Sequence, residues 1–206
     1  MWLSVLTAVL VGYFLGNLNG AVCMSALLHD DVRTHGSGNA GLTNFIRNYG
    51  AGKSVTVLLI DAGKAVLACL AGRLLLMPYG LQLEGSVIAG VAVMVGHIFP
   101  ALLGFRGGKG ILSGLFIALM ADWRIAAIIL TVFAVVYLLT WYVSLGSVLA
   151  SVAFAVCFAA FYYDNLTVLI CGVFMGALTV FMHRGNIARL CKGEERKTNL
   201  FGKGER

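Results

Sequence analysis

Long apolar stretches separated by short polar segments constrain the fold of this chain more than any other feature. A helix that crosses a membrane needs roughly 20 apolar residues. Seven stretches approach or reach that length: 2–28, 54–76, 84–103, 110–121, 124–140, 142–161 and 165–182. Hydrophobic residues make up 60% of the chain and charged residues only 12%, which excludes an ordinary soluble globular domain. The sequence therefore predicts an all-α integral membrane protein with seven transmembrane helices.

Two of these stretches have unusual lengths. The fourth, 110–121, spans only about 12 residues, or roughly 18 Å of helix against a hydrocarbon core of about 30 Å, so we expect a short or re-entrant helix that other helices shield from lipid. The first is too long for the apolar region of a signal peptide, and no Lys or Arg precedes it, so we expect it to remain as a spanning helix. The chain length favours a single membrane domain, 1–206.

The distribution of basic residues predicts the orientation, because cytoplasmic loops of membrane proteins carry an excess of Lys and Arg. With the N-terminus outside, the cytoplasmic segments hold twelve of the fifteen basic residues: Arg33, Arg47, Lys53, Arg106, Lys109, Arg184, Arg189, Lys192, Arg196, Lys197, Lys203 and Arg206. We therefore expect an external N-terminus and a cytoplasmic C-terminus. For the tail, contact with anionic lipid is an additional interpretation.

The first polar loop, 29–53, contains the segment "DDVRTHGSGNAGLTNFIRNYG". Its glycines allow backbone N–H groups to point into one concavity, a geometry that binds phosphate. The segment also supplies neutral donors and a guanidinium that fits a phosphate: Ser37, Asn39, Thr43, Asn44 and Arg47. We expect Thr43 or Asn44 to cap a short helix that runs toward Lys53. The alternative is an ordinary flexible loop.

The second polar loop, 104–110, lies within "GHIFPALLGFRGGKGI". Pro100 cannot donate a backbone hydrogen bond, so it is expected to end or kink the third helix. Gly107, Gly108 and Lys109 then lead into a helix, an arrangement that offers amides, a helix N-terminus and an ammonium to a phosphate. His97 is interpreted either as a contact between packed helices or as part of the site.

The third polar segment, 183–196, begins with "HRGNIARLCKGEE". His183 and Asn186 are three residues apart and share one face if the segment is helical. Such a pair is suited to holding an oxyanion or a hydroxyl, although both residues are also common at a membrane interface. Ser144 and Ser147, in "YVSLGS", lie at the start of the sixth stretch, where they either allow close helix packing or reach the same site.

Asp61 and Lys64 lie three residues apart inside the second apolar stretch, close enough to pair. An intramembrane ion pair is a candidate functional site, and a role in helix packing is an equal alternative. The cysteines show no metal-ligand spacing and no cluster of acidic residues is apparent, so we expect neither a metal nor a cofactor.

At these motifs the chain resembles the bacterial acyl-phosphate:glycerol-3-phosphate acyltransferase family of small integral membrane enzymes. "GSGNAGLTN" with Arg47 is similar to the family's first signature, "GHIFP" followed by "FRGGKG" to the second, and "HRGNIARLCKGEE" to the third; "YVSLGS" is also similar. The resemblance runs from about residue 12 to residue 196. Leu42, Ala65 and Trp141 depart from the usual family residues, but no polar motif residue is lost.

The resemblance implies transfer of a fatty acyl group from acyl phosphate to the 1-hydroxyl of sn-glycerol 3-phosphate, at the cytoplasmic face of the bacterial plasma membrane. It implies lipid contact, no nucleic-acid partner, and the soluble enzyme that makes acyl phosphate as a candidate protein partner. The leading catalytic candidates are Ser37, Arg47, Lys109, His183 and Asn186. Further substrate-binding candidates are Gly38, Asn39, Thr43, Asn44, His97, Gly107, Gly108, Ser144 and Ser147. Direct transfer is favoured over an acyl-Ser37 intermediate.

Two other classes of protein stay open on the residues alone. Glycine-rich loops and broken helices also build the permeation sites of transporters and channels, here for an organophosphate. A non-catalytic lipid-binding or scaffold protein is the other alternative, for which Arg47, Lys109 and His183 would be needlessly specific.

Overall fold

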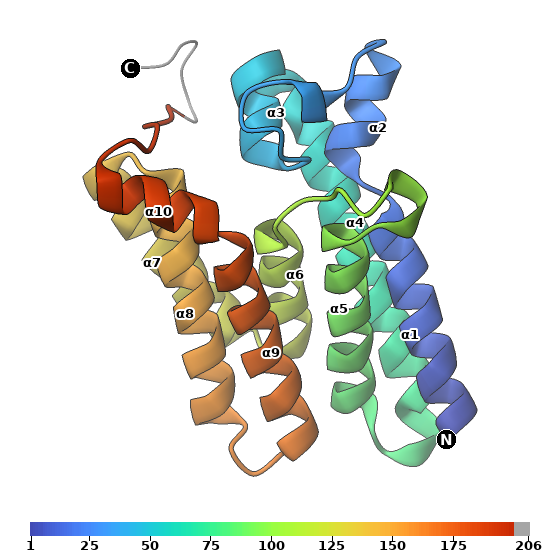
Figure 1. Ribbon diagram of the computed structural model, residues 1–206. Coiled ribbons are helices and arrows are strands. Elements are labelled where there is room, and N and C mark those ends of the chain that lie inside the picture. The colour runs from blue at the N-terminus through green and yellow to red at the C-terminus, as the bar shows by residue number, and fades with distance from the viewer. Residues whose placement is uncertain (200–206) are drawn as a thin grey trace.

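The computed structural model describes residues 1–199, which form ten α-helices joined by short turns and 3₁₀ segments (Figure 1). The α-helices are α1 (Trp2–Asn17), α2 (Gly20–Leu27), α3 (Leu42–Tyr49), α4 (Ala51–Leu76), α5 (Gln82–Ile98), α6 (Ile111–Ala121), α7 (Trp123–Thr140), α8 (Val143–Phe161), α9 (Leu166–Met182) and α10 (Arg184–Lys192). The 3₁₀ segments are η1 (Val32–Thr34), η2 (Met77–Tyr79) and η3 (Ala101–Leu103). The prediction of an all-α protein is confirmed. Lys203 and Arg206, which contributed to the predicted orientation, lie outside the described residues.

Five helical segments of residues 1–199 are long and apolar enough to cross a membrane: Trp2–Leu27, Ala51–Tyr79, Gln82–Leu103, Trp123–Thr140 and Val143–Phe161. A sixth is added if α9 and α10, which are bent by 51° at their junction, count as one span. The remaining apolar helix, α6, has 11 residues, so the fourth predicted helix is short, as expected. The structure thus gives five to six candidate spans rather than seven full ones.

The first predicted helix, 2–28, is not continuous. It is interrupted between α1 and α2, where Asn19 has extended backbone angles and its side-chain oxygen accepts a hydrogen bond from Val22 N at 3.0 Å. Asn19 is therefore the N-cap of α2, a position that Asn favours. The segment Trp2–Leu27 is a candidate membrane span, as expected, but it contains a break that was not predicted, because the cap lies inside an apolar stretch.

The helices form two groups on either side of α6 (Figure 1), with α1, α4 and α5 in one and α7, α8 and α9 in the other. Small residues allow very close packing in the first group. A Cβ atom on Gly72 of α4 would lie 2.1 Å from the carbonyl oxygen of Gly85 in α5, and a Cβ on Gly16 of α1 would lie 2.4 Å from that of Val93. Close approach of this kind stabilises helix pairs in a membrane, where lipid supplies little hydrophobic driving force.

The polar segments gather at one end of the bundle, which we call the site end. Figure 1 shows α2, α3 and α10 at this end and the N-terminus at the other. At the site end, Arg33 Nη1 donates to Leu103 O at 3.1 Å and Arg47 Nε donates to Thr198 Oγ1 at 2.9 Å. At the opposite end, the N-terminal amine donates to Tyr79 OH at 2.8 Å. The fold therefore brings together three polar segments that are far apart in the sequence.

Candidate active site

The first glycine-rich loop is wrapped around one buried side chain, Asn44. Its Nδ2 donates to the carbonyl oxygens of Val32, His35 and Asn39 at 3.0–3.1 Å, and its Oδ1 accepts from Ser37 N at 3.1 Å. Asn44 is 3% exposed, so these bonds form away from water. The amide thus closes the loop into a ring and fixes the backbone of Ser37.

The predicted capping of α3 by Thr43 or Asn44 was wrong. The helix begins at Leu42, its N-cap is Gly41, and no side chain of the described residues caps it. Asn44 points back into the loop instead, where it has more backbone partners than a cap offers. The short helix itself is present, but it ends at Tyr49, and Lys53 belongs to α4.

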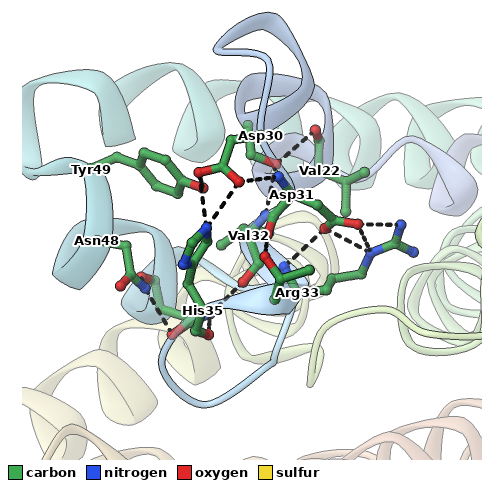
Figure 2. A network of polar contacts seen from close by, with 11 residues as sticks. Val22, Asp30, Asp31, Val32, Arg33, His35, Asn48 and Tyr49 are labelled. Carbon is green, nitrogen blue, oxygen red and sulfur yellow. Dashed lines mark hydrogen bonds and ion pairs between the residues drawn. The ribbon is translucent and has the colours of Figure 1, made fainter.

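A second network braces the outside of this loop (Figure 2). The Asp30 carboxylate lies 2.9 Å from His35 Nε2 and accepts a hydrogen bond from Tyr49 OH at 2.9 Å. The contact with His35 contributes most to lowering the pKa of Asp30 below its usual value. Asp31 caps η1 through Arg33 N and pairs with the Arg33 guanidinium, whose Nη1 bonds to Leu103 O in η3. The network therefore joins the first glycine-rich loop to the 3₁₀ segment that precedes the second.

The second glycine-rich loop lies directly on the end of α5. Gly107 N donates to Ile98 O at 3.2 Å, and Gly108 N donates to His97 O at 3.1 Å. A Cβ atom on Gly107 would lie 1.9 Å from His97 O, and one on Gly108 would lie 2.1 Å from His97 Nε2, so only glycine fits at either position. Both amides donate to α5 rather than pointing into open space. The glycines thereby place Lys109, which follows them.

Lys109 reaches the third polar segment. Its Nζ donates to Asn186 Oδ1. Burial disfavours the charged ammonium and lowers the pKa of Lys109 to about 8, although the nearby Glu195 carboxylate acts in the opposite direction. The positive charge of Lys109 is therefore sensitive to pH near neutrality.

The third segment forms at the bend between α9 and α10. His183 is the residue at the bend, and its Nδ1 lies 2.8 Å from Thr179 O. A carbonyl only accepts, so Nδ1 carries the hydrogen and, in the neutral ring, Nε2 is left as an acceptor. Asn186 follows in the first turn of α10. His183 and Asn186 are 3% and 8% exposed, respectively, so both lie in a sheltered position.

Glu195, which was not predicted as a site residue, lies beside Asn186 and Arg189. Its Oε1 accepts from Asn186 Nδ2 at 2.9 Å and its Oε2 accepts from Arg189 Nε at 2.7 Å, while only 4% of the side chain is exposed. Gly193, with a positive φ of 71°, turns the chain back after α10 and makes this approach possible. A glycine after a predicted helix indicates that the helix ends there and the chain turns. It does not indicate which residues the chain contacts after the turn.

Arg47 also contacts the segment after α10. Its Nε and Nη2 donate to Thr198 Oγ1, and Nη2 lies 3.4 Å from Arg196 O. Thr198 is in turn anchored by Tyr137 OH, which donates to its carbonyl oxygen at 3.0 Å, and by its own N–H, which donates to Trp141 O at 3.1 Å. The chain after α10 therefore crosses between α3 and α7, a contact that no periodic pattern of residues indicates.

One cavity of about 350 Å³ connects these groups. Eleven of the predicted site residues line it: Ser37, Asn39, Thr43, Asn44, Arg47, His97, Lys109, Ser144, Ser147, His183 and Asn186. Gly38, Gly107 and Gly108 are not among the lining residues. Asp61, which with Lys64 was a candidate functional pair with helix packing as an equal alternative, also lines the cavity, and so does Glu195, which was not predicted. The predicted contact between Asp61 and Lys64 is confirmed, with Lys64 Nζ 2.8 Å from Asp61 Oδ1.

The inner part of the cavity is apolar. Its wall includes Met94, Ile129, Phe133, Phe154 and Met175, from α5, α7, α8 and α9. The cavity thus combines a polar region at the site end with an apolar region between the helices. Within residues 1–199, no group of three or more His, Cys, Asp or Glu side chains could hold a metal ion.

Comparison with known proteins identifies the family to which this chain belongs. A family model described as glycerol-3-phosphate acyltransferase matches residues 6–193. The chain belongs to the glycerol-3-phosphate acyltransferase family. Membership makes the protein an integral membrane acyltransferase of phospholipid synthesis, with lysophosphatidic acid as its product. Family membership therefore favours an enzyme over the two alternatives, a transporter or channel and a non-catalytic lipid-binding or scaffold protein.

Two glycerol-3-phosphate acyltransferases illustrate the similarity in sequence. The chain is 37% identical to that of Thermoanaerobacter sp. (strain X514) over 195 residues, which cover 94% of this chain and 95% of the relative. It is 41% identical to that of Anaeromyxobacter dehalogenans (strain 2CP-C) over 198 residues, covering 94% and 98%.

Two solved structures of PlsY (YgiH), an integral membrane glycerol 3-phosphate acyltransferase, share the fold. The glycerol 3-phosphate form superposes with a TM-score of 0.85 at 29% identity and covers 97% of this chain and 100% of that one. The lysophosphatidic acid form gives a TM-score of 0.82 at 30% identity and covers 96% of each chain. The acyltransferase described here therefore has the PlsY fold.

Proposed function

We propose that this acyltransferase uses acyl phosphate as its acyl donor and transfers the acyl group to the 1-hydroxyl of sn-glycerol 3-phosphate, with release of phosphate. The observation that carries the proposal is one continuous cavity that has a cationic polar region and an apolar extension. Acyl phosphate has a phosphate joined to a fatty chain, and the acceptor has a second phosphate. Arg47 and Lys109 supply two positive charges, in addition to Arg189, which is paired with Glu195, and the helices supply the apolar wall.

Different polar side chains of the cavity bind and orient the two substrates. Arg47 and Lys109 bind the phosphates, Ser37 donates a hydrogen bond to acyl phosphate, and His183 with Asn186 holds glycerol phosphate. The acceptor nitrogen Nε2 of His183 is suited to a glycerol hydroxyl. Around them, the supporting candidates are Gly38, Asn39, Thr43, Asn44, His97, Gly107, Gly108, Ser144 and Ser147. Ser144 Oγ is buried and has no hydrogen-bond partner among the described residues, as expected of a donor that awaits a ligand.

The chemistry requires orientation more than an activated side chain. Acyl phosphate is a mixed anhydride, so its carbonyl carbon is already reactive. The glycerol 1-hydroxyl oxygen attacks this carbon, the bond between the carbonyl carbon and the phosphate oxygen breaks, and the hydroxyl proton passes to a phosphate oxygen. Holding the two reactants in contact and neutralising the phosphate charge then supply most of the catalysis.

We further propose the membrane arrangement. The chain forms one membrane domain with seven membrane segments, in which α6 is the short one and α9 with α10 is the bent one. The N-terminus lies outside, and the site end faces the cytoplasm of a bacterial plasma membrane. This orientation is supported by the basic residues of the site end.

The orientation lets soluble glycerol phosphate enter from the cytoplasm while the fatty product leaves into the adjacent leaflet. The soluble enzyme that makes acyl phosphate is the candidate protein partner on that side.

The donor is tested by supplying the purified protein with glycerol 3-phosphate and one acyl donor at a time. We expect lysophosphatidic acid from acyl phosphate and none from the matching acyl thioester, since the thioester lacks the phosphate that the basic side chains bind. An equal rate with the thioester contradicts the proposed donor. Uptake of glycerol 3-phosphate by proteoliposomes without acyl transfer contradicts the enzymatic role altogether.

A further inference from the structure

A cluster of buried polar side chains joins α4 to α5 at membrane depth. Lys64 Nζ lies 2.8 Å from Asp61 Oδ1 and 2.8 Å from His97 Nδ1. None of the three residues is more than 5% exposed. Burying an ion pair is costly, and apolar side chains of similar size often stabilise a fold as well, so helix packing alone does not account for these charges.

The cluster also holds the break between α1 and α2. Lys64 Nζ donates to Gly16 O at 3.3 Å and to Leu18 O at 2.6 Å, and Gly20 N donates to Asp61 Oδ1 at 3.2 Å. Helix ends leave such backbone groups without partners in their own helix, and hydrocarbon offers none. The charges of α4 supply these partners and so stabilise the break between α1 and α2.

The break in turn holds the first glycine-rich loop. Asn19 lies in it, is fully buried, and donates from Nδ2 to Ala40 O at 3.0 Å. Ala40 follows Asn39 in the loop that presents Ser37. A shift of the break is therefore passed to this loop through one amide side chain.

The same cluster holds the second glycine-rich loop through His97. Lys64 donates to Nδ1 and thereby fixes the imidazole ring, whose Nε2 lies directly against Gly108. The backbone oxygen of His97 accepts the Gly108 N–H, and Lys109 is the next residue. The Lys64 ammonium is thus connected by hydrogen bonds to both loops, to the first through the break and Asn19 and to the second through His97.

We propose that Asp61, Lys64 and Asn19 are positioning residues that set the distance between the loop of Ser37 and the loop of Lys109. Lys64 and Asn19 are not among the residues that line the cavity, so they act on the substrates only through their neighbours. Asp61 does line the cavity, so the hydrogen exchange of the two loops, and not turnover alone, tests its positioning role. The inference rests on the roles proposed above for Ser37 and Lys109. A misplacement of about 1 Å between reacting groups costs roughly 10²-fold in rate, so small shifts of these loops matter.

The test is the double variant Asp61→Asn with Lys64→Met, which removes both charges and leaves no buried ion unpaired. We expect turnover to fall about 10-fold or more. Hydrogen exchange should become faster at residues 35–41 and 104–110, and should stay unchanged in the turn 162–165 at the opposite end. Ser54→Ala is the matched control, because Ser54 is buried on the same helix and bonds only to Gly50 O of its own first turn among the contacts described.

A milder variant keeps the test informative if the double variant does not fold. In Asn19→Ser, the serine hydroxyl still caps α2, but it is too short to replace the contact with Ala40 O. We expect faster exchange at residues 35–41 alone, unchanged exchange at 104–110, and a turnover several-fold below that of the wild type.

Three results separate the possibilities. Wild-type exchange at both loops in the folded double variant overturns the inference, and so does faster exchange spread evenly over the whole protein. Faster exchange at the two loops with full turnover supports the proposal that the buried cluster positions these loops. It contradicts the proposed roles of Ser37 and Lys109 in substrate binding. Failure of the proposed function is thus distinguished from failure of this inference.

Discussion

The charge of Lys109 should set the upper limit of the enzyme's pH range. Burial lowers the pKa of Lys109 to about 8, with Glu195 raising it and Arg189 and Arg47 lowering it further. At a pKa of about 8, the charged fraction in the free enzyme is about 0.9 at pH 7 and about 0.1 at pH 9. If only charged Lys109 binds phosphate, kcat/KM should fall about ninefold over this range, because kcat/KM reports ionisation of the free enzyme.

The assay is the initial rate of lysophosphatidic acid formation at low glycerol 3-phosphate, from pH 7 to pH 9. A phosphate monoester has its second pKa near 6, so the acceptor stays doubly charged throughout and contributes no slope. Lys109→Arg is the matched control, since a guanidinium remains protonated; its profile should be flat even if its rate is lower. A decline centred near pH 8 that persists in Lys109→Arg refutes the reasoning, as does a flat wild-type profile.

Three further predictions concern the other polar groups and the topology. Arg47→Lys keeps the charge but loses the planar fork, so kcat/KM should fall roughly 10-fold or more; near-normal kinetics contradict phosphate binding by Arg47. Ser37→Ala should lower turnover by roughly 10²–10³, the effect of losing one oriented donor, and wild-type enzyme given labelled acyl phosphate alone should carry no hydroxylamine-sensitive label on Ser37. Reporter fusions after residue 206 and within 77–83 should lie on opposite sides of the membrane, and the same side for both contradicts the odd number of membrane segments.

Much of the fold was predictable because hydropathy and helix-ending residues are local signals. Pro100 correctly indicated the end of α5, which stops at Ile98, and the short apolar stretch correctly indicated α6. The break before Asn19 was not predictable in the same way. It lies inside an apolar stretch, and the groups that stabilise it, Asp61 and Lys64, belong to another helix.

The candidate site was predictable in its members more than in its contacts. Polar residue types marked the three segments, because such residues are rare in an apolar chain. What each side chain touches depends on tertiary structure: Asn44 closes a loop rather than capping α3, and Arg47 meets Thr198. Glu195 was missed because the chain must first turn at Gly193 before its carboxylate can reach Asn186.

The most direct test of the account is the initial-rate pattern with both substrates varied. Direct transfer requires acyl phosphate and glycerol 3-phosphate to occupy the one cavity together, so double-reciprocal plots at several fixed concentrations of glycerol 3-phosphate should intersect. An acyl-enzyme intermediate instead lets phosphate leave before the acceptor reacts. Parallel lines, the pattern of that route, would contradict the account.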